Sequence, residues 1–146
     1  MRGKKIKTIP ASNHPVHSYT QRVYYGDTDC SGFVYHARYL DFFERARTEL
    51  LRSCGFDYAS FAKDELVFVV RHLRIQYYQP ARMDDNLHIA SKITKLTAAR
   101  LVLNQQLFKE EKNIVEAELE LALVNTAGRP SRLPSKLLQA FLQYTA

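Results

Sequence analysis

The spacing of apolar and polar residues predicts one long amphipathic helix, from about His36 to Ser53. Apolar residues recur there at helical intervals, and charged residues take the opposite face. The apolar positions are Tyr39, Phe43, Ala46 and Leu50. A helix of this length makes about five turns, and Gly55 is suited to follow its last residue. The apolar stripe of such a helix requires a surface that covers it.

Runs of alternating or β-branched residues predict five strands. One strand precedes the helix, at 16–25, and four follow it, at 66–78, 86–96, 100–109 and 113–125. Links of hairpin length join the last three strands, which predicts an antiparallel meander. Two short helices complete the pattern: Asp57 caps one that reaches about Lys63, and Pro134 opens another near the end of the chain.

The order of these elements predicts an α+β fold, in which a five-stranded, curved antiparallel sheet wraps around one long central helix. The last strand supports this fold, because acidic and apolar residues alternate along it. Its acids are Glu116, Glu118 and Glu120, and its apolar residues are Val115, Ala117, Leu119 and Leu121. A chain of 146 residues suits one core. We therefore expect a mobile tail at 1–16 and a single domain at 17–146.

Composition and charge limit which binding partners and which cellular location are expected for this protein. The formal net charge of +6 favours an anionic partner, such as nucleic acid, an acidic carrier protein or a phosphorylated cofactor. Nucleic acid is disfavoured, because the basic residues are not clustered with aromatic ones. No apolar run reaches the roughly 20 residues that span a bilayer, and the basic N-terminus lacks the apolar segment of a secretory signal. Cys30 and Cys54 match no metal-ligand spacing, and without export we expect no disulfide between them. These features predict a cytoplasmic protein without stable membrane insertion.

The polar turn between the first strand and the helix contains the candidate chemistry. It holds Asp27 and Asp29, and residue type alone does not separate the two carboxylates. Asp29 is the leading candidate, since it lies just before a helix start, whose free N–H groups favour negative charge. A carboxylate there suits general-base or nucleophilic acyl transfer, with N–H groups around His36 stabilising the oxyanion. Gly32 allows a positive φ or the close approach of a ligand.

Other side chains near the turn offer weaker chemistry. The His36 imidazole is a candidate acid, base or ligand, but no second metal ligand stands at helical spacing from it. Ser31 is not in a nucleophile elbow, and Cys30 has no recognisable partner. Arg100 opens a strand after a short turn, where it is a candidate phosphate ligand or an ordinary exposed charge.

The turn and the helix start together resemble a known family. The motif reads Tyr25-Gly26-Asp27-Thr28-Asp29, then Gly32, Val34-Tyr35-His36 and Tyr39, followed by Phe43-Glu44-Arg45-Ala46-Arg47. The likeness continues through Phe68-Val69-Val70-Arg71 and the stretch from Tyr77 to Asp85. This sequence resembles the hot-dog-fold acyl-CoA thioesterases of the 4-hydroxybenzoyl-CoA thioesterase family, and most of all the Tol–Pal-associated branch.

The resemblance implies a fold, a site and an assembly. It implies a hot-dog fold, Asp29 as the catalytic carboxylate, and the backbone N–H of His36 as the group that polarises the carbonyl. The imidazole of His36 and Tyr35 are expected to line the acyl pocket, and Gly32 to give room for close approach. It also implies homodimers paired into homotetramers, with the site between subunits and basic residues on the CoA phosphates. Arg100 is the one cation in a segment where aromatic-acyl members have several, and Cys30 replaces a proline of the hydroxybenzoyl enzyme.

We therefore predict an acyl-CoA thioesterase that releases a free acid and CoA without a metal or cofactor. The alternative is a non-enzymatic module of the same fold that binds acyl carrier protein or enzymes of lipid synthesis. A hot-dog dehydratase is less consistent with the sequence, because its histidine belongs to a Pro-Gly-containing motif that His36-Ala37-Arg38 lacks.

Overall fold

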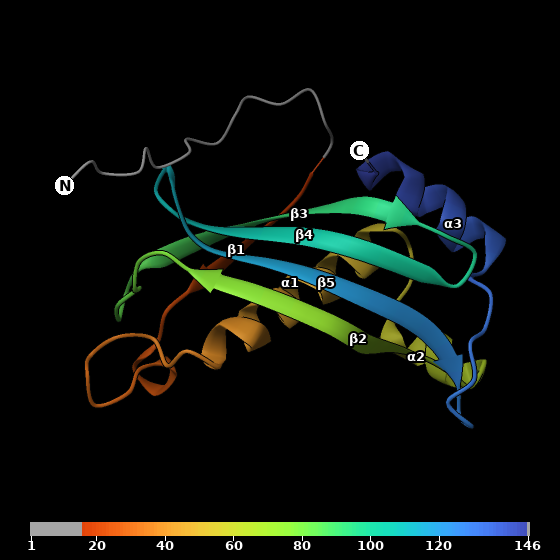
Figure 1. Cartoon of the computed structure of the whole chain (residues 1–146), viewed down its shortest axis with the longest axis horizontal. Coiled ribbons are helices and arrows are strands. Elements are labelled where there is room, and N and C mark those ends of the chain that lie inside the picture. The colour runs from red at the N-terminus through yellow and green to blue at the C-terminus, as the bar shows by residue number, and fades with distance from the viewer. Residues whose placement is uncertain (1–15, 146) are drawn as a thin grey trace.

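The computed structural model describes residues 16–145 and has one curved antiparallel sheet with a long helix across one face (Figure 1). The strands are β1 His17–Arg22, β2 Leu66–Tyr77, β3 Asn86–Leu96, β4 Arg100–Lys109 and β5 Lys112–Asn125. The helices are α1 Arg38–Ser53, α2 Tyr58–Lys63 and α3 Ser135–Phe141, with 3₁₀ turns η1 Tyr25–Asp27 and η2 Leu142–Tyr144. The α+β class, the five-stranded sheet and the central helix are confirmed.

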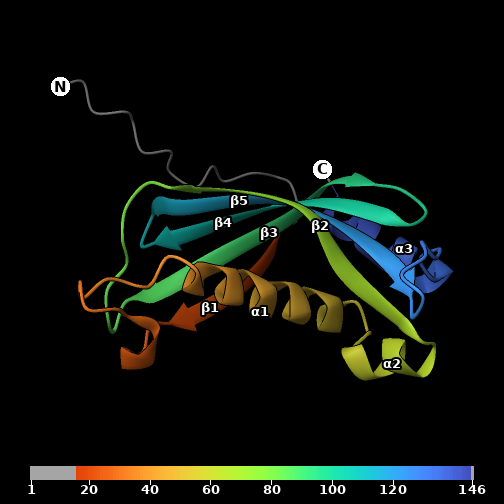
Figure 2. The ribbon, with the colours of Figure 1, turned by 60° about the horizontal axis from the view of Figure 1, so that its bottom comes forward.

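The sheet has the strand order β1-β3-β4-β5-β2, with every neighbouring pair antiparallel. The predicted meander is therefore correct for β3, β4 and β5. The two strands that flank α1 in sequence, β1 and β2, form the two edges of the sheet. Figure 2 shows α1 lying beneath the sheet with β1 and β2 on either side of it. This arrangement buries the apolar stripe of α1 and leaves its first turn near the end of β2.

The buried face of α1 contains the four predicted apolar positions and two more. Its buried residues are Tyr39, Phe42, Phe43, Ala46, Leu50 and Leu51. Phe42 was not among the predicted core residues, yet it lies three positions after Tyr39 and so shares its face. On β5, Val115, Ala117, Leu119 and Leu121 are buried, as the alternation predicted.

Two element boundaries differ from the prediction by two or more residues, both beside the polar turn. The first strand ends at Arg22, because Tyr25–Asp27 forms a 3₁₀ turn in place of further strand. The helix starts at Arg38, since residues 28 and 34 pair in a small bridge that holds the preceding backbone out of the helix. Residues 1–15 of the predicted mobile tail at 1–16 lie outside the described residues, and the domain bounds remain a prediction.

The predicted C-terminal end of α1 and the predicted N-cap of α2 are both confirmed. Gly55 has φ +84°, and its N–H donates to the Arg52 carbonyl at 3.0 Å. The Phe56 N–H reaches back to the Leu51 carbonyl at 3.2 Å, which completes the paired bonds of a Schellman motif. Asp57 caps α2, because its carboxylate accepts the Ser60 N–H at 2.8 Å.

Candidate active site

The candidate carboxylate lies in a small hairpin that connects η1 to α1. Thr28 and Val34 form an antiparallel bridge, and the Asp29 N–H donates to the Phe33 carbonyl at 3.0 Å. The Gly32 N–H returns to the Asp29 carbonyl at 3.0 Å, with Gly32 at φ +82°. A left-handed residue closes this tight turn, which is the role for which glycine is best suited. The hairpin therefore holds Asp29 at a defined place in front of α1.

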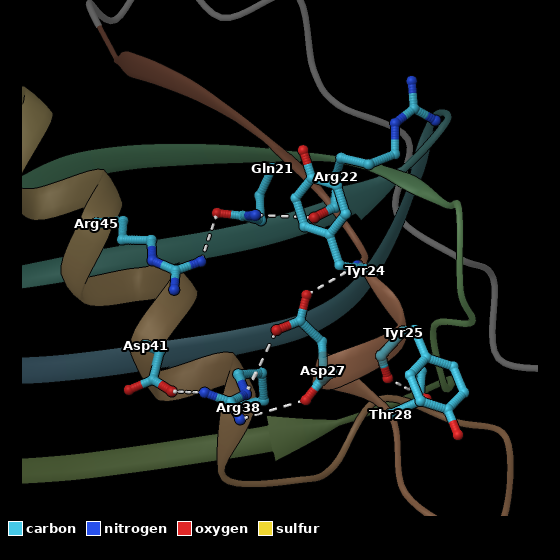
Figure 3. A network of polar contacts seen from close by, with 10 residues as sticks. Gln21, Arg22, Tyr24, Tyr25, Asp27, Thr28, Arg38, Asp41 and Arg45 are labelled. Carbon is cyan, nitrogen blue, oxygen red and sulfur yellow. Dashed lines mark hydrogen bonds and ion pairs between the residues drawn. The ribbon is translucent and has the colours of Figure 1, made fainter.

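The structure separates the two acids that residue type alone did not distinguish. The Asp27 carboxylate is buried, accepts the Tyr24 N–H at 2.9 Å and lies 3.5 Å from Nε of Arg38. Arg38 in turn bonds Asp41 at 3.0 Å, so Asp27 belongs to a network that ties η1 to the start of α1 (Figure 3). Asp29 is exposed and outside that network. Asp27 thus has a structural role, and Asp29 is the free acid.

One oxygen of Asp29 is engaged and the other is available. Oδ1 accepts the Ser31 N–H at 2.8 Å and the Ser31 hydroxyl. These two bonds, with a smaller contribution from the nearby His36, lower the pKa of Asp29 below its ordinary value. The carboxylate is therefore ionised at neutral pH. Oδ2 accepts no hydrogen bond from the described residues, which leaves a charged oxygen free for a ligand or a water molecule.

Asp29 faces a cavity of about 360 Å³, within the size range of small-molecule sites. The lining residues are Asp29, Ser31, Phe33, Val34, His36, Tyr39, Tyr77, Tyr78, Gln79 and Pro80. They come from the hairpin, the start of α1 and the end of β2. The Tyr77 hydroxyl donates to the His36 carbonyl at 2.8 Å, and the Tyr39 hydroxyl accepts the Ala81 N–H at 3.0 Å. These bonds join the walls, so the cavity is largely preformed.

Two backbone N–H groups just before α1 are free of hydrogen bonds within the described residues. The Tyr35 N–H donates to the Asp27 carbonyl at 2.9 Å, and the Arg38 N–H donates to the Tyr35 carbonyl at 2.8 Å. Between them, the N–H groups of His36 and Ala37 have no acceptor among residues 16–145, and no side chain caps the helix at Ala37. Unpaired N–H groups at a helix start carry partial positive charge. His36 also lines the cavity, so an anionic oxygen placed there would meet that charge.

The structure brings together some of the predicted site residues and not others. Asp29 and His36 share the cavity, whereas Gly32 shapes the turn and is not among its lining residues. Tyr35 is exposed, with its ring centroid 4.6 Å from that of His36, and is likewise outside the lining set. Arg100 lies elsewhere, at the beginning of β4, with its guanidinium 3.6 Å from the Glu120 carboxylate. Arg100 is not among the residues that line the cavity with Asp29.

Several residues that build the cavity walls were not predicted from the sequence. Phe33 lies in the hairpin, and Tyr77, Tyr78 and Pro80 come from the end of β2 and the loop after it. The last three lie in a stretch that carried the family resemblance, which was the available signal for them. The β-branched and aromatic residues at 66–78 indicated only a strand, closed by Pro80, and the approach of its end to α1 depends on the sheet order.

Neither a metal cluster nor a spanning helix occurs in the described part of the chain. Within residues 16–145, no group of three or more His, Cys, Asp or Glu side chains is placed to hold a metal ion. No helix among them is both long and apolar enough to cross a membrane.

Comparison with known proteins places the chain among thioesterases. Residues 23–141 match the model of the thioesterase-like superfamily. Acyl-CoA thioester hydrolase YbgC of Escherichia coli O6:H1 is 41% identical over 124 residues, covering 84% of this chain and 92% of that protein. Acyl-CoA thioesterase YbgC of Haemophilus influenzae is 38% identical over 126 residues, covering 85% and 93%. The crystal structure of a probable thioesterase from Bartonella henselae aligns with a TM-score of 0.78 at 47% identity, covering 82% of this chain and 100% of that one. These matches confirm the predicted hot-dog fold and the family resemblance.

Proposed function

This chain belongs to the thioesterase-like superfamily and is a thioesterase, and we propose that it hydrolyses acyl-CoA at Asp29 with help from the start of α1. The relatives named as acyl-CoA thioester hydrolases support the choice of acyl-CoA as substrate. The observation that carries the mechanism is that a free carboxylate oxygen of Asp29 and the unpaired N–H of His36 border one cavity.

Asp29 supplies the base or the nucleophile. As a base, it takes a proton from water, whose oxygen attacks the thioester carbonyl carbon. As a nucleophile, Oδ2 attacks that carbon directly, and water then cleaves the resulting anhydride. In either route the C–S bond breaks, CoA leaves as the thiol after protonation, and the acyl group leaves as the free acid. The low pKa of Asp29 keeps the carboxylate ionised for both routes.

The start of α1 stabilises the charge that forms on the carbonyl oxygen. Attack converts the thioester carbonyl into an oxyanion, and the His36 N–H is a fixed donor for it. The Tyr77 hydroxyl donates to the His36 carbonyl at 2.8 Å and so restrains the orientation of the peptide units around this residue. The donor is already in place before the reaction, so little reorganisation is needed when the charge develops.

Replacement of Asp29 by Asn tests this proposal. D29N keeps the shape of the side chain but removes its charge, and we expect turnover of an acyl-CoA panel to fall on the order of 10³-fold. Thiol release, measured with a chromogenic thiol reagent, gives the rate for each substrate. Asp57 offers a matched control, because its carboxylate also accepts the N–H and hydroxyl of a nearby serine, Ser60, at 2.8 and 2.9 Å. D57N should retain wild-type turnover, and equal turnover of D29N and wild type would contradict the mechanism.

The proposed assembly is a homodimer or a pair of dimers, with edge strand β2 as the contact. Among the described strands β2 pairs with β5 alone, so within residues 16–145 its other edge is open. Its exposed apolar residues include Val67, Val69, Val70 and Leu73. An open, apolar edge strand of this length favours pairing with a second copy. Sedimentation equilibrium tests this, and a monomer at micromolar concentration would rule it out. Tol–Pal association, a cytoplasmic location and an acyl carrier protein as a second partner remain predictions from the sequence.

A further inference from the structure

Arg82, in the loop between β2 and β3, lies beside the hairpin that carries Asp29. Its backbone pairs with Phe33 in an isolated antiparallel bridge. Its guanidinium carbon lies 4.5 Å from the centroid of the Phe33 ring, and that ring lines the cavity that Asp29 faces. Arg82 is exposed. A cation is therefore held at the rim of the cavity, outside its apolar wall.

No described residue neutralises the charge of Arg82. Within residues 16–145, no carboxylate lies within ion-pair distance of its guanidinium. The nearby Asp85 is already engaged, since it accepts the Arg82 backbone N–H at 2.8 Å and lies 3.0 Å from Nζ of Lys109. Arg38 and Arg100, by contrast, are each paired with an acid. Arg82 is thus an available cation beside the cavity.

The contact with Phe33 presents the guanidinium in a form suited to phosphate. An arginine over an aromatic ring is held by the π face of that ring. Its N–H groups point outward in the plane of the guanidinium, where they match two oxygens of a phosphate. The ring contact also restricts the long side chain, so less conformational freedom is lost when an anion binds. A lysine at this position would supply the charge without the fork of donors.

We propose that Arg82 binds a phosphate group of the CoA portion of the substrate at the rim of the cavity. The inference rests on the proposed function, in which the thioester lies between Asp29 and His36. CoA is then the part of the substrate that leaves the cavity for solvent, and its phosphates are its anionic groups. Arg82 is a binding residue for CoA, and the phosphate contact suggested from the sequence for Arg100 stays a separate prediction.

A pair of substrates that share the acyl group separates this role from catalysis. One is an acyl-CoA, and the other is the same acyl group on N-acetylcysteamine, which keeps the thioester but has no phosphate. For R82Q we expect the KM for acyl-CoA to rise on the order of tenfold, as for loss of an exposed charge-assisted contact, with kcat unchanged. The kcat/KM for the N-acetylcysteamine thioester should not change. R82K should fall between wild type and R82Q for acyl-CoA.

Two controls make the result decisive. R52Q removes another exposed arginine, at the far end of α1 and 3.6 Å from Glu49, and should leave both substrates unaffected. Thermal unfolding of R82Q should match that of the wild type. An equal loss on both substrates would show that Arg82 only supports Phe33 and the hairpin, and an unchanged KM for acyl-CoA would also overturn the inference. With either of these two outcomes, the proposed function still stands if the wild type hydrolyses both thioesters. If wild type hydrolyses neither, the proposed function fails first.

Discussion

The two ends of α1 satisfy their backbone in opposite ways. At the C-terminal end, Gly55 and Phe56 donate to the carbonyls of Arg52 and Leu51 at 3.0 and 3.2 Å. At the other end, Ala37 provides no side-chain cap, and the His36 N–H has no acceptor among residues 16–145. Every helix leaves several groups unpaired at each end. Here the local chain satisfies the C-terminal groups and leaves donors free where a cavity adjoins the helix.

This difference assigns each end a separate physical role. Leu50 and Leu51 in the last turns pack in a core cluster with Ile93 and Leu103 of the sheet. A closed end there contributes to stability. At the N-terminal end, the free N–H groups beside the Asp29 carboxylate make no hydrogen bond to a described residue that would add to folding stability. They instead offer fixed donors to a developing negative charge. Substitutions at the start of α1 should therefore affect turnover, and those at its end should affect unfolding.

The largest expected effect comes from removing the free donor at His36. H36P has no backbone N–H at this position, and we expect kcat to fall by about 10²-fold or more, as for loss of one oxyanion donor. H36A keeps the N–H and removes only the imidazole, so it should retain most of the activity. Steady-state thiol release from one acyl-CoA provides the comparison.

Proline also restricts the backbone of the preceding residue, Tyr35, so H36P could lose activity because its fold is disturbed. Thermal unfolding of both His36 variants tests this alternative. If H36P unfolds near the wild-type temperature but has lost activity, the result supports the His36 N–H as the oxyanion donor. If H36A is as inactive as H36P, the imidazole performs the essential step and the backbone contact does not.

A smaller effect is expected at the other end of the helix. G55A places a side chain at φ +84°, and the left-handed conformation should lower the free energy of unfolding by about 1–2 kcal/mol. No atom lies within 4 Å of the added Cβ, so the strain is conformational and not steric. Differential scanning calorimetry should show a midpoint a few degrees lower, with kcat unchanged.

Gly26 is the matched control for G55A. It also has open space for a Cβ but is not among the glycines with positive φ. G26A should therefore unfold close to the wild-type temperature. Equal destabilisation by the two substitutions would remove the left-handed conformation as the cause.

The smallest expected effect concerns pH. The Ser31 hydroxyl and N–H lower the pKa of Asp29 from the ordinary value of 3.8, so the ionised form is present above that depressed pKa and is lost as pH falls through it. S31A removes the hydroxyl bond and should raise the pKa of Asp29, moving the acidic limb of the kcat/KM profile to higher pH. Circular dichroism at each pH checks that the fold persists. S60A, which makes the same change at Asp57, should leave the profile in place, and a shift of equal size in both variants would count against Asp29.

Local pattern determined most of the fold. The period of Tyr39, Phe43, Ala46 and Leu50 predicted α1, and alternation along 113–125 predicted which side chains face the core. Both predictions depend on which residues lie on one face of an element, a property of neighbours in the chain. The Schellman end at Gly55 and the cap at Asp57 were predictable for the same reason. The position before the helix start favoured Asp29 over Asp27, and the resemblance supported the same choice, which residue type alone could not make.

Tertiary structure decided which residues share the site. Asp27 and Asp29 differ in role because only Asp27 lies within reach of Arg38 from the next element, and no local pattern states that. Tyr77 and Arg82 reach the hairpin because β2 lies at the sheet edge next to the start of α1. Arg100, whose sequence context was as suggestive, lies beside Glu120 instead. The contacts of Tyr77 with His36 and of Arg82 with Phe33 join residues 41 and 49 positions apart, and the packing of the whole chain determines them.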